Sequence, residues 1–287
     1  HWGVPLTLAR MPADTDYAII EIGMSNPGEI APLARMARPH VALITTIAPA
    51  HIGAFGHLDG IAHEKAAIFD GLTPGGAAII PTSLSTTPIL RQAADDAGAP
   101  ILSFGDAGEA RLISSIPEGD LLRVRGALSG KPINFTLQSV GPHFANNAMG
   151  VLAAISAAGG DVIDAAKHLA DWQPPQGRGA VEDLGDIRLI DDAFNANPSS
   201  RGAGLATLAR LPGTRRVAIL GDMLELGDDE NAQHAALAED PAMASVDLVH
   251  AAGPRMKHLL DALPDAKRGL WAESADALAL RLDEMVR

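Results

Sequence analysis

The chain has 287 residues, of which 22 are basic and 35 acidic, giving a formal net charge of −13. With 47% hydrophobic and 20% charged residues, it has the composition of a globular protein, and its length predicts about two domains. The acidic balance argues against a general nucleic-acid binder, and the absence of cysteine excludes disulfide scaffolds, zinc–thiolate sites and thiol nucleophiles.

The first part of the chain alternates between short apolar runs and helical patterns. Runs at residues 17–22, 41–47 and 76–80 predict strands that are buried on both faces of a sheet. Helices are predicted between them, over residues 29–37 and 61–71. This alternation predicts an α/β fold with a mostly parallel sheet and helices on both of its faces.

The pattern changes between about residues 101 and 140. Gly, Pro and Asp separate short segments there, and those at 121–125 and 133–137 predict short antiparallel strands at the edge of the same domain. Helical patterning returns at residues 146–158 and 162–172.

Residues 173–179 contain two prolines and two glycines, which predicts a hinge. We therefore expect one domain over residues 1–177 and a second α/β domain over residues 178–287. In the second domain, strands are predicted at 187–191, 217–220 and 246–250, and helices at 202–211, 231–239, 257–263 and 274–286. No apolar stretch approaches the roughly 20 residues of a transmembrane helix and no signal peptide is visible, so we expect no stable membrane insertion. We also expect a cytoplasmic location and a monomer.

Three side chains in the first domain are candidates for chemistry. Glu21 lies one residue before the end of the first predicted strand, and His51 follows the second. Ligands of α/β sheets bind at the carboxyl ends of strands, so this pair could share a metal, although each alone is equally well explained as solvent-exposed. Lys65 lies along the apolar stripe of a predicted helix, where it is either a lysine that reaches solvent or a buried one with a lowered pKa.

Further candidates lie around the hinge. Asn146 and Asn147 open a predicted helix, where they either cap it or meet a phosphate or polar ring. Arg178 either binds a phosphate or is simply solvated. Residues 191–198, Asp-Asp-Ala-Phe-Asn-Ala-Asn-Pro, form either a turn with a helix N-cap or a loop whose donors and acceptors suit a ribose and a base.

Several of these segments resemble the Mur ligases. They are Glu21-Ile-Gly-Met with Pro27-Gly-Glu-Ile, Ala50-His with Phe55-Gly, and Lys65 before Ile68-Phe. The segments 191–198 and 221–227, the latter Gly-Asp-Met-Leu-Glu-Leu-Gly, are longer and more specific. The resemblance extends from residue 2 to about residue 253.

The resemblance implies a central, ATP-binding domain followed by a Rossmann-like C-terminal domain. It implies an enzyme, an ATP-dependent amide ligase of peptidoglycan synthesis and cell-wall formation, which converts a carboxylate to an acyl phosphate that an amine then attacks. The two specific segments are most similar to those of the member that joins D-alanyl-D-alanine to the UDP-N-acetylmuramoyl tripeptide. ATP and Mg²⁺ are the expected cofactors.

The resemblance also implies roles for single residues. Glu21 and His51 are expected to bind Mg²⁺, and Lys65 matches a lysine that is carbamylated in several family members and supports the metal. Lys65 and His51 are the expected catalytic residues. The expected nucleotide-binding residues are Asn147, Arg178, Asp192, Asn195 and Asn197.

The chain departs from the family pattern at several points. No Gly-Lys-Thr phosphate loop occurs in its 287 residues, and residue 1 is His, so we expect both domains to be incomplete and the chain alone to lack ligase activity. Phe194 stands where Tyr is usual. Arg201, Gly202 and Gly204 stand where Met and Ala are typical, and because glycine costs about 1 kcal/mol relative to alanine inside a helix, we expect that helix to be weakened.

Two other interpretations stay open. One is a non-catalytic α/β fragment that binds a nucleotide weakly through residues 195–197. The other is a sister ligase that adds a different amino acid, or adds glutamate to folate, although the segment 221–227 argues against it by resemblance.

Overall fold

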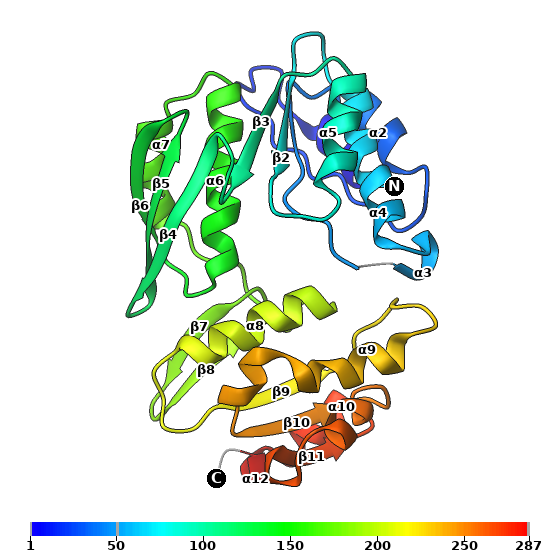
Figure 1. Cartoon of the computed structure of the whole chain (residues 1–287), viewed down its shortest axis with the longest axis vertical. Coiled ribbons are helices and arrows are strands. Elements are labelled where there is room, and N and C mark those ends of the chain that lie inside the picture. The colour runs from blue at the N-terminus through cyan, green and yellow to red at the C-terminus, as the bar shows by residue number, and fades with distance from the viewer. Residues whose placement is uncertain (1, 50–51, 286–287) are drawn as a thin grey trace. The chain divides into compact units, whose positions relative to one another are not determined.

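A computed structural model describes residues 2–49 and 52–285, and the chain in it forms two compact units (Figure 1). The first unit contains most of residues 2–172. The second contains residues 173–285 together with the short segments 119–121 and 138–143. No helix in the described part of the chain is long and apolar enough to cross a membrane.

The first unit is built on a six-stranded sheet whose strands follow one another in chain order. Three neighbouring pairs, β1 with β2, β2 with β3 and β3 with β4, are parallel, whereas β5 and β6 form an antiparallel hairpin. The sheet is therefore mainly parallel with an antiparallel edge, as predicted. The strands are β1 (Val41–Leu43), β2 (Ala77–Pro81), β3 (Ile101–Gly105), β4 (Ala110–Glu118), β5 (Leu121–Leu128) and β6 (Lys131–Leu137).

Helices pack against both faces of this sheet. All five residues of β2 are buried, and they alternate between two cores: Ile79 joins the core formed with α6, and Ile80 joins the core formed with α4 and α5. The continuous apolar run that predicted a strand buried on both faces is thus confirmed. The helices of this unit are α1 (Gly3–Arg10), α2 (Ile30–Ala37), α3 (Ile52–Phe55), α4 (Leu58–Ala66), α5 (Thr87–Asp96), α6 (Pro142–Ala157) and α7 (Val162–His168), with 3₁₀ turns at Ala67–Gly71 and Leu169–Asp171.

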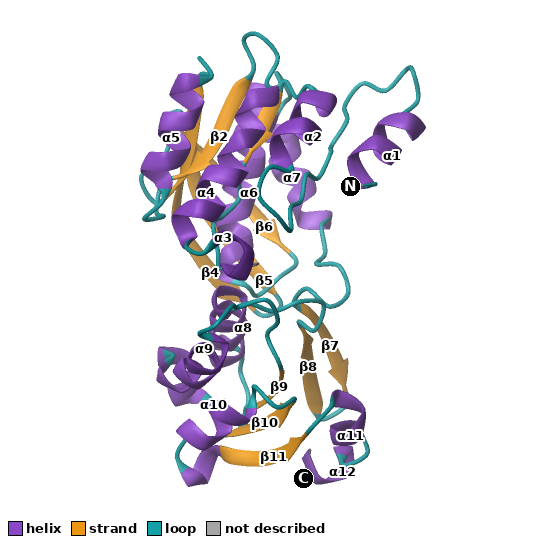
Figure 2. Cartoon of the chain, turned by 90° about the vertical axis from the view of Figure 1, so that its right-hand side faces the viewer, coloured by secondary structure: helices purple, strands orange, loops and turns teal. Residues whose placement is uncertain are grey.

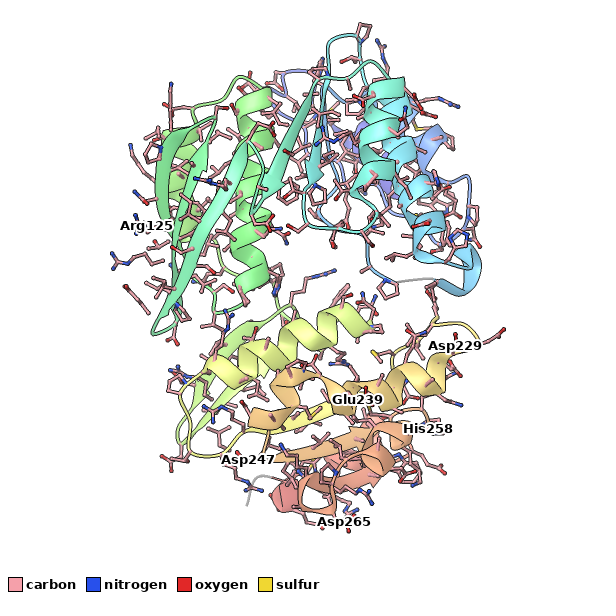
Figure 3. All side chains as sticks on the ribbon, viewed as in Figure 1. Arg125, Asp229, Glu239, Asp247, His258 and Asp265 are labelled. Carbon is pink, nitrogen blue, oxygen red and sulfur yellow. The ribbon has the colours of Figure 1, made fainter. Side chains whose placement is uncertain are left out.

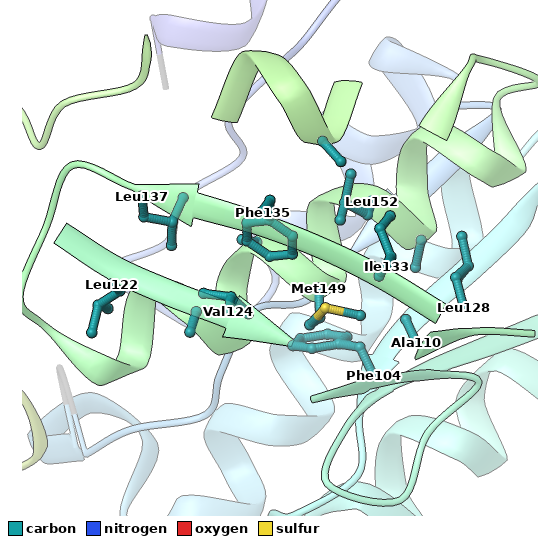
Figure 4. Close-up of a cluster of buried hydrophobic side chains, with 14 of the residues drawn as sticks. Phe104, Ala110, Leu122, Val124, Leu128, Ile133, Phe135, Leu137, Met149 and Leu152 are labelled. Carbon is teal, nitrogen blue, oxygen red and sulfur yellow. The ribbon is translucent and has the colours of Figure 1, made fainter. Parts of the chain in front are cut away.

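The core between the hairpin and α6 contains Phe104, Met149 and Leu152 (Figure 4), and it leaves little room for a side chain at Gly150. The Phe104 ring lies against α6, and a Cβ at Gly150 would come within 3.2 Å of three ring atoms. Met149 and Leu152, from the same helix, are fully buried among the side chains of β5 and β6. A larger residue at position 150 would therefore push the helix away from Phe104.

One predicted strand is wrong. Residues 17–22 form no strand in the described structure, and Ile19 is 97% exposed. An apolar run becomes a strand only where its backbone N–H and C=O groups form hydrogen bonds with a neighbouring strand. Residues 17–22 have no such neighbour in the described sheet, which begins at β1. The other predicted strands and helices of this unit are present within a few residues, but α1, α3, α5, β3 and β4 were not predicted.

The second unit contains a hairpin and a small parallel sheet (Figure 2). The hairpin pairs β7 (Ala180–Leu184) with β8 (Ile187–Asp191) in antiparallel register, and the sheet has the order β11-β10-β9. The sheet strands are β9 (Val217–Gly221), β10 (Leu248–Ala252) and β11 (Arg268–Ala272). The helices are α8 (Pro198–Arg210), α9 (Glu230–Ala236), α10 (Lys257–Ala262), α11 (Ala275–Ala279) and α12 (Leu282–Met285), with 3₁₀ turns at Leu237–Glu239, Pro241–Ser245 and Asp265–Lys267.

The second α/β unit is therefore confirmed, with local differences. The predicted strand at 246–250 lies two residues later, and the single helix predicted at 274–286 is divided into α11 and α12. The strands β7 and β11 were not predicted. Exposed charged side chains occur in both units, and Arg125 in the first and Asp265 in the second are labelled in Figure 3.

Candidate functional site

Lys65 and Glu21 lie close together in the first unit. Lys65 is half-buried on α4, four residues after the fully buried Ile61, as its position on the apolar stripe predicted. Burial lowers the pKa of Lys65, and the neighbouring carboxylate of Glu21 opposes that effect by raising it. A lysine with a lowered pKa is more readily deprotonated, and its neutral amine is then a nucleophile.

Glu64, the residue before Lys65, fixes the loop that leads into α2. Its Oε2 accepts a hydrogen bond from the Gly28 N–H at 2.7 Å, and its Oε1 accepts one from the Ile30 N–H at 2.8 Å. These are donors at the start of a helix, which have no partner within the helix itself. Sequence reasoning missed this role because the two partners lie 34 and 36 residues apart in the chain.

The described residues supply only part of a metal site. His51 lies outside them, and among residues 2–49 and 52–285 no three His, Asp or Glu side chains are gathered so that they could hold a metal ion. Mg²⁺ is commonly bound by one or two carboxylates with phosphate oxygens and water, so the exposed Glu21 carboxylate fits that ion. The ammonium form of Lys65 does not fit, because it is cationic and has no lone pair.

A second polar cluster follows the ends of β2 and β3. The Asp106 Oδ1 accepts hydrogen bonds from the Ser83 hydroxyl at 2.6 Å and from the Thr82 hydroxyl at 3.2 Å. These two hydrogen bonds lower the pKa of Asp106. The cluster joins adjacent loops at the carboxyl edge of the parallel sheet, where ligands of such sheets bind. Sequence reasoning did not single out any of the three.

Asn147 does not cap a helix. The helix α6 begins at Pro142, four residues before the predicted start, so Asn147 is half-buried in its second turn. Proline is favoured in the first turn of a helix, and this explains the earlier start. The amide of Asn147 therefore serves no capping role at the start of α6.

In the second unit, a tight turn holds Arg178 over Phe194. The guanidinium carbon of Arg178 lies 4.2 Å from the centroid of the Phe194 ring. The Asp191 Oδ2 accepts a hydrogen bond from the Gly177 N–H at 3.0 Å, and the Gly177 carbonyl accepts one from the Phe194 N–H at 3.0 Å. Through these two hydrogen bonds, Gly177 connects the start of β7 to the loop after β8.

Asp192 is half-buried beside Arg201 and Gly204 of α8. Burial has the largest effect on the Asp192 carboxyl and raises its pKa, and the adjacent Asp191 acts in the same direction. Arg201 and Arg178 lower the pKa, but the net shift is upward. A Cβ at Gly204 would lie 3.1 Å from the Asp192 Oδ2. The carboxylate therefore lies directly against the glycine in the second turn of the helix.

The two asparagines of the loop differ in their contacts. Asn197 is the N-cap of α8: its Oδ1 accepts the Ser200 N–H at 3.0 Å, while the Ser200 hydroxyl accepts the Asn197 N–H at 2.9 Å. Asn195 is exposed, and its Oδ1 accepts the Ala196 N–H at 2.8 Å. Both side-chain oxygens are occupied by the backbone, which leaves the amide N–H groups as the groups that a ligand would meet.

The segment 221–227 is held by Asp222 and His234. The Asp222 Oδ1 accepts the Met256 N–H at 2.7 Å, and the fully buried His234 accepts the Met223 N–H through Nε2 at 2.9 Å. His234 Nδ1 lies 2.6 Å from the Glu230 carbonyl, which fixes Nδ1 as the protonated nitrogen. This segment is thus built as a rigid loop at the end of β9.

The expected residues are distributed over both units. Glu21 and Lys65 come together in the first unit, which also contains Asn147. Arg178 and Asp192 interact electrostatically in the second unit, next to the two asparagines of the same loop.

Comparison with known proteins covers both units. Residues 1–155 match the family model of the Mur ligase middle domain, and residues 177–287 match that of the Mur ligase, glutamate ligase domain.

Individual relatives match along almost the whole chain. UDP-N-acetylmuramoyl-tripeptide--D-alanyl-D-alanine ligases from Rickettsia prowazekii and Escherichia coli are 35% and 34% identical over 99% and 97% of this chain. A crystal structure of MurF from Acinetobacter baumannii superposes with a TM-score of 0.91 at 30% identity over 98% of this chain. The chain spans 64%, 61% and 61% of the lengths of these three proteins, respectively. The chain belongs to the Mur ligase family.

Proposed function

We propose that this chain contains the ATP-using domains of a ligase that joins D-alanyl-D-alanine to the UDP-N-acetylmuramoyl tripeptide in peptidoglycan synthesis. Its relatives of that name match it over 97% and 99% of its length. The observation that carries the proposal is the half-buried Lys65 beside the Glu21 carboxylate, a pair suited to a metal-assisted phosphoryl transfer. In this proposal residues 1–177 are the central domain and residues 178–287 the C-terminal domain.

The reaction has two steps. A carboxylate oxygen of the tripeptide attacks the γ-phosphorus of ATP, and the bond to the β-phosphate oxygen breaks, giving an acyl phosphate and ADP. The amine of D-alanyl-D-alanine then attacks the acyl carbon and loses a proton, and inorganic phosphate leaves. Mg²⁺, when bound, would neutralise the charge on the phosphoryl oxygens.

In the first domain we assign the metal to Glu21, His51 and Lys65. Glu21 supplies a carboxylate oxygen. Lys65 fits a cation only after its neutral amine has attacked the carbon of carbon dioxide and lost a proton, which converts it to a carbamate with two oxygen ligands. The lowered pKa of Lys65 favours that reaction.

We assign the nucleotide to Asn147, Arg178 and the loop 191–198. Arg178 is held in place by its stacking on Phe194 and presents a planar donor group that suits phosphate oxygens. Asp192 provides an acceptor for ribose hydroxyls, and the free amide N–H groups of Asn195 and Asn197 provide donors for the base. A charged, water-soluble nucleotide substrate also favours a cytoplasmic location, and we propose a monomer.

Two measurements test the proposal, one of Mg-ATP binding and one of phosphate release. Isothermal titration of the 287-residue chain with Mg-ATP is expected to give heat that Asp192→Ala reduces and that Asp183→Ala, on the exposed hairpin, leaves unchanged. In a polypeptide that carries this chain behind a phosphate loop, phosphate release is expected to require both the tripeptide nucleotide and D-alanyl-D-alanine. Phosphate release that needs only one of these two substrates would contradict the proposal.

A further inference from the structure

We propose that a hollow between the β5–β6 hairpin and α7 binds a small organic anion that carries two phosphoryl groups on a carbon skeleton. The hollow has a volume of about 510 Å³ and lies entirely within the first unit. It adjoins β6, the last strand of the six-stranded sheet, whereas α4 with Lys65 packs against β1 and β2. The site is therefore separate from the pair of Lys65 and Glu21, and it does not depend on the proposed function.

Three cationic side chains line the hollow. Arg123 and Arg125 come from β5, and Lys167 comes from α7. None of the described residues that line it is acidic, although the chain as a whole has a formal net charge of −13. Cations gathered in a concave surface raise the local concentration of anions. The hollow is thus a locally cationic site on an acidic protein.

The alternation of β5 places the two arginines on the outer face of the hairpin. Val124, between them, is fully buried in the core with α6, while Arg123 and Arg125 are exposed. Arg125 is labelled in Figure 3. Two residues of a strand span about 7 Å, so the two guanidinium groups start from neighbouring points on one face. Their partners across the hairpin, Thr136 and Asn134, share that face and add neutral hydrogen-bonding groups to the lining.

All three cations are available to a ligand. The guanidinium of Arg125 has no hydrogen bond or ion pair with any residue that the structure describes. Arg123 donates to the Glu118 carboxylate at 2.6 Å, but the two side chains of this ion pair are 60% and 50% exposed. The Lys167 Nζ lies 3.8 Å from the Asp164 Oδ1, and both of these side chains are exposed as well. Exposed ion pairs contribute little, so a phosphoryl oxygen can replace either carboxylate at low cost.

The size and lining of the hollow indicate the class of ligand. Pockets of roughly 300–1,000 Å³ hold molecules of the size of a drug, so a single phosphate ion would fill little of this one. Phe135 and two alanines give the lining an apolar part, which suits a carbon skeleton. Each arginine can bind one phosphoryl group through two parallel hydrogen bonds. Their separation of about 7 Å favours phosphoryl groups held apart by a carbon skeleton over the directly linked phosphates of ATP.

Amide NMR of the ¹⁵N-labelled 287-residue chain would test the site, with fructose 1,6-bisphosphate as the probe. This molecule carries its two phosphoryl groups at opposite ends of a sugar. We expect saturable shifts of the backbone amide signals of Arg123, Arg125, Asn134 and Thr136, and these shifts should persist in excess Mg-ATP. Fructose 6-phosphate and inorganic phosphate should bind about tenfold more weakly, because each lacks one interaction with a charged group. The absence of saturable shifts, equally tight binding of inorganic phosphate, or displacement by Mg-ATP would overturn the proposal.

Three substitutions distinguish a specific site from a general attraction between charges. Arg125→Gln is expected to weaken binding of fructose 1,6-bisphosphate about tenfold. Lys131→Gln removes the same charge from an exposed residue of β6 outside the hollow, and screening by salt should keep its effect below about twofold. Glu118→Gln releases Arg123 from its ion pair and should tighten binding by up to about fivefold, a gain that loss of folding cannot produce. Equal losses in Arg125→Gln and Lys131→Gln, or weaker binding in Glu118→Gln, would contradict the proposal.

Discussion

The guanidinium of Arg178 stacks on the ring of Phe194, with its central carbon 4.2 Å from the ring centroid. The ring is two-thirds exposed, so the stack lies at the surface of the second unit. Cation–π contacts at exposed sites contribute about 0.5–1 kcal/mol, which is enough to favour one orientation of a long side chain. The planar face of Phe194 thus limits the directions in which Arg178 can donate hydrogen bonds.

This contact predicts how Arg178 contributes to nucleotide binding. Phe194→Leu removes the aromatic face and is expected to weaken Mg-ATP binding about two- to fivefold, whereas Phe194→Tyr keeps the stack and should leave binding unchanged. Arg178→Lys replaces the planar fork with a point charge and should cost more, about tenfold. Arg188→Lys is the control, because Arg188 pairs with Asp183 and Asp120 rather than with the loop. Isothermal titration would measure all four, and equal losses in Phe194→Leu and Phe194→Tyr would contradict the stacking role.

Gly177 should be intolerant of any side chain. Its φ is +75°, and a Cβ would lie 3.0 Å from the Phe194 Cβ. Gly185, in the β7–β8 turn, has a similar φ of +70° but nothing within 4 Å of the added atom. We expect Gly185→Ala to lower the free energy of unfolding by about 1 kcal/mol through backbone strain alone. Gly177→Ala should lower it by about 2–3 kcal/mol, because overpacking adds to the same strain. Urea denaturation would compare the two, and equal losses would show that the contact with Phe194 has no energetic effect.

The sequence predicted those elements of the fold that periodicity and burial determine. The strand β2 was identified because each of its residues is buried, and β8 because an apolar run ends at two acids. The strand β7 was missed because three of its five residues are exposed, and two of those three are acids. Residues 17–22 were predicted wrongly because their composition suits a strand, while strand formation depends on a neighbour that the sequence pattern does not specify.

The candidate site was less predictable, because its contacts join distant segments. The position of Lys65 followed from helical spacing, whereas its proximity to Glu21 was implied only by the family resemblance, because the strand predicted to carry Glu21 is not formed. The roles of Glu64 and His234 could not be inferred, since a glutamate or a histidine on a helix has many ordinary explanations. Arg201 was noticed only as a departure from a family pattern, and its hydrogen bond to the Gly221 carbonyl becomes visible only in the fold.

Lys65 is expected to react with carbon dioxide more readily than an exposed lysine. Its lowered pKa leaves a larger fraction of neutral amine at a given pH, and only the neutral amine attacks carbon dioxide. With [¹³C]bicarbonate at mildly alkaline pH, we expect a carbamate signal in the NMR spectrum that disappears in Lys65→Gln and persists in Lys167→Gln, where the exposed Lys167 is replaced. A carbamate signal that survives Lys65→Gln would assign the modification to another amine.

Glu64 is expected to stabilise the loop before α2. Glu64→Ala removes the acceptor of two backbone N–H groups and should lower the free energy of unfolding by about 2 kcal/mol, whereas Glu64→Gln keeps one oxygen and should cost less. The control is Glu118→Ala, because its ion pair with Arg123 is exposed and should contribute little to stability. Urea denaturation would measure the three variants. Equal effects of Glu64→Ala and Glu118→Ala would show that the two hydrogen bonds add nothing.

His250 should make the second unit less stable in acid. It is 1% exposed on β10, and its Nδ1 accepts the Leu270 N–H at 2.9 Å. Burial lowers its pKa below the usual 6.5, the Met285 backbone acts in the opposite direction, and Arg215 and Arg281 add to the lowering. Below about pH 6.5 the unfolded chain takes up a proton that the folded chain resists, so the free energy of unfolding falls as the pH falls towards the folded-state pKa. Well above pH 6.5 both states are neutral at this residue, and it adds no pH dependence.

The acid sensitivity should disappear when the titrating ring is replaced by an amide. His250→Asn keeps an acceptor for the Leu270 N–H, so it should flatten the loss of stability between neutral and acidic pH at some cost in packing. His258→Asn is the matched control, because that side chain is exposed on α10, and it should leave the pH dependence in place. Native-state hydrogen exchange of the amides in β9, β10 and β11 would report the stability of this sheet alone. A pH slope in His250→Asn equal to that of the unmodified chain would assign the acid sensitivity to another group, because the substituted residue has no proton to gain in this range.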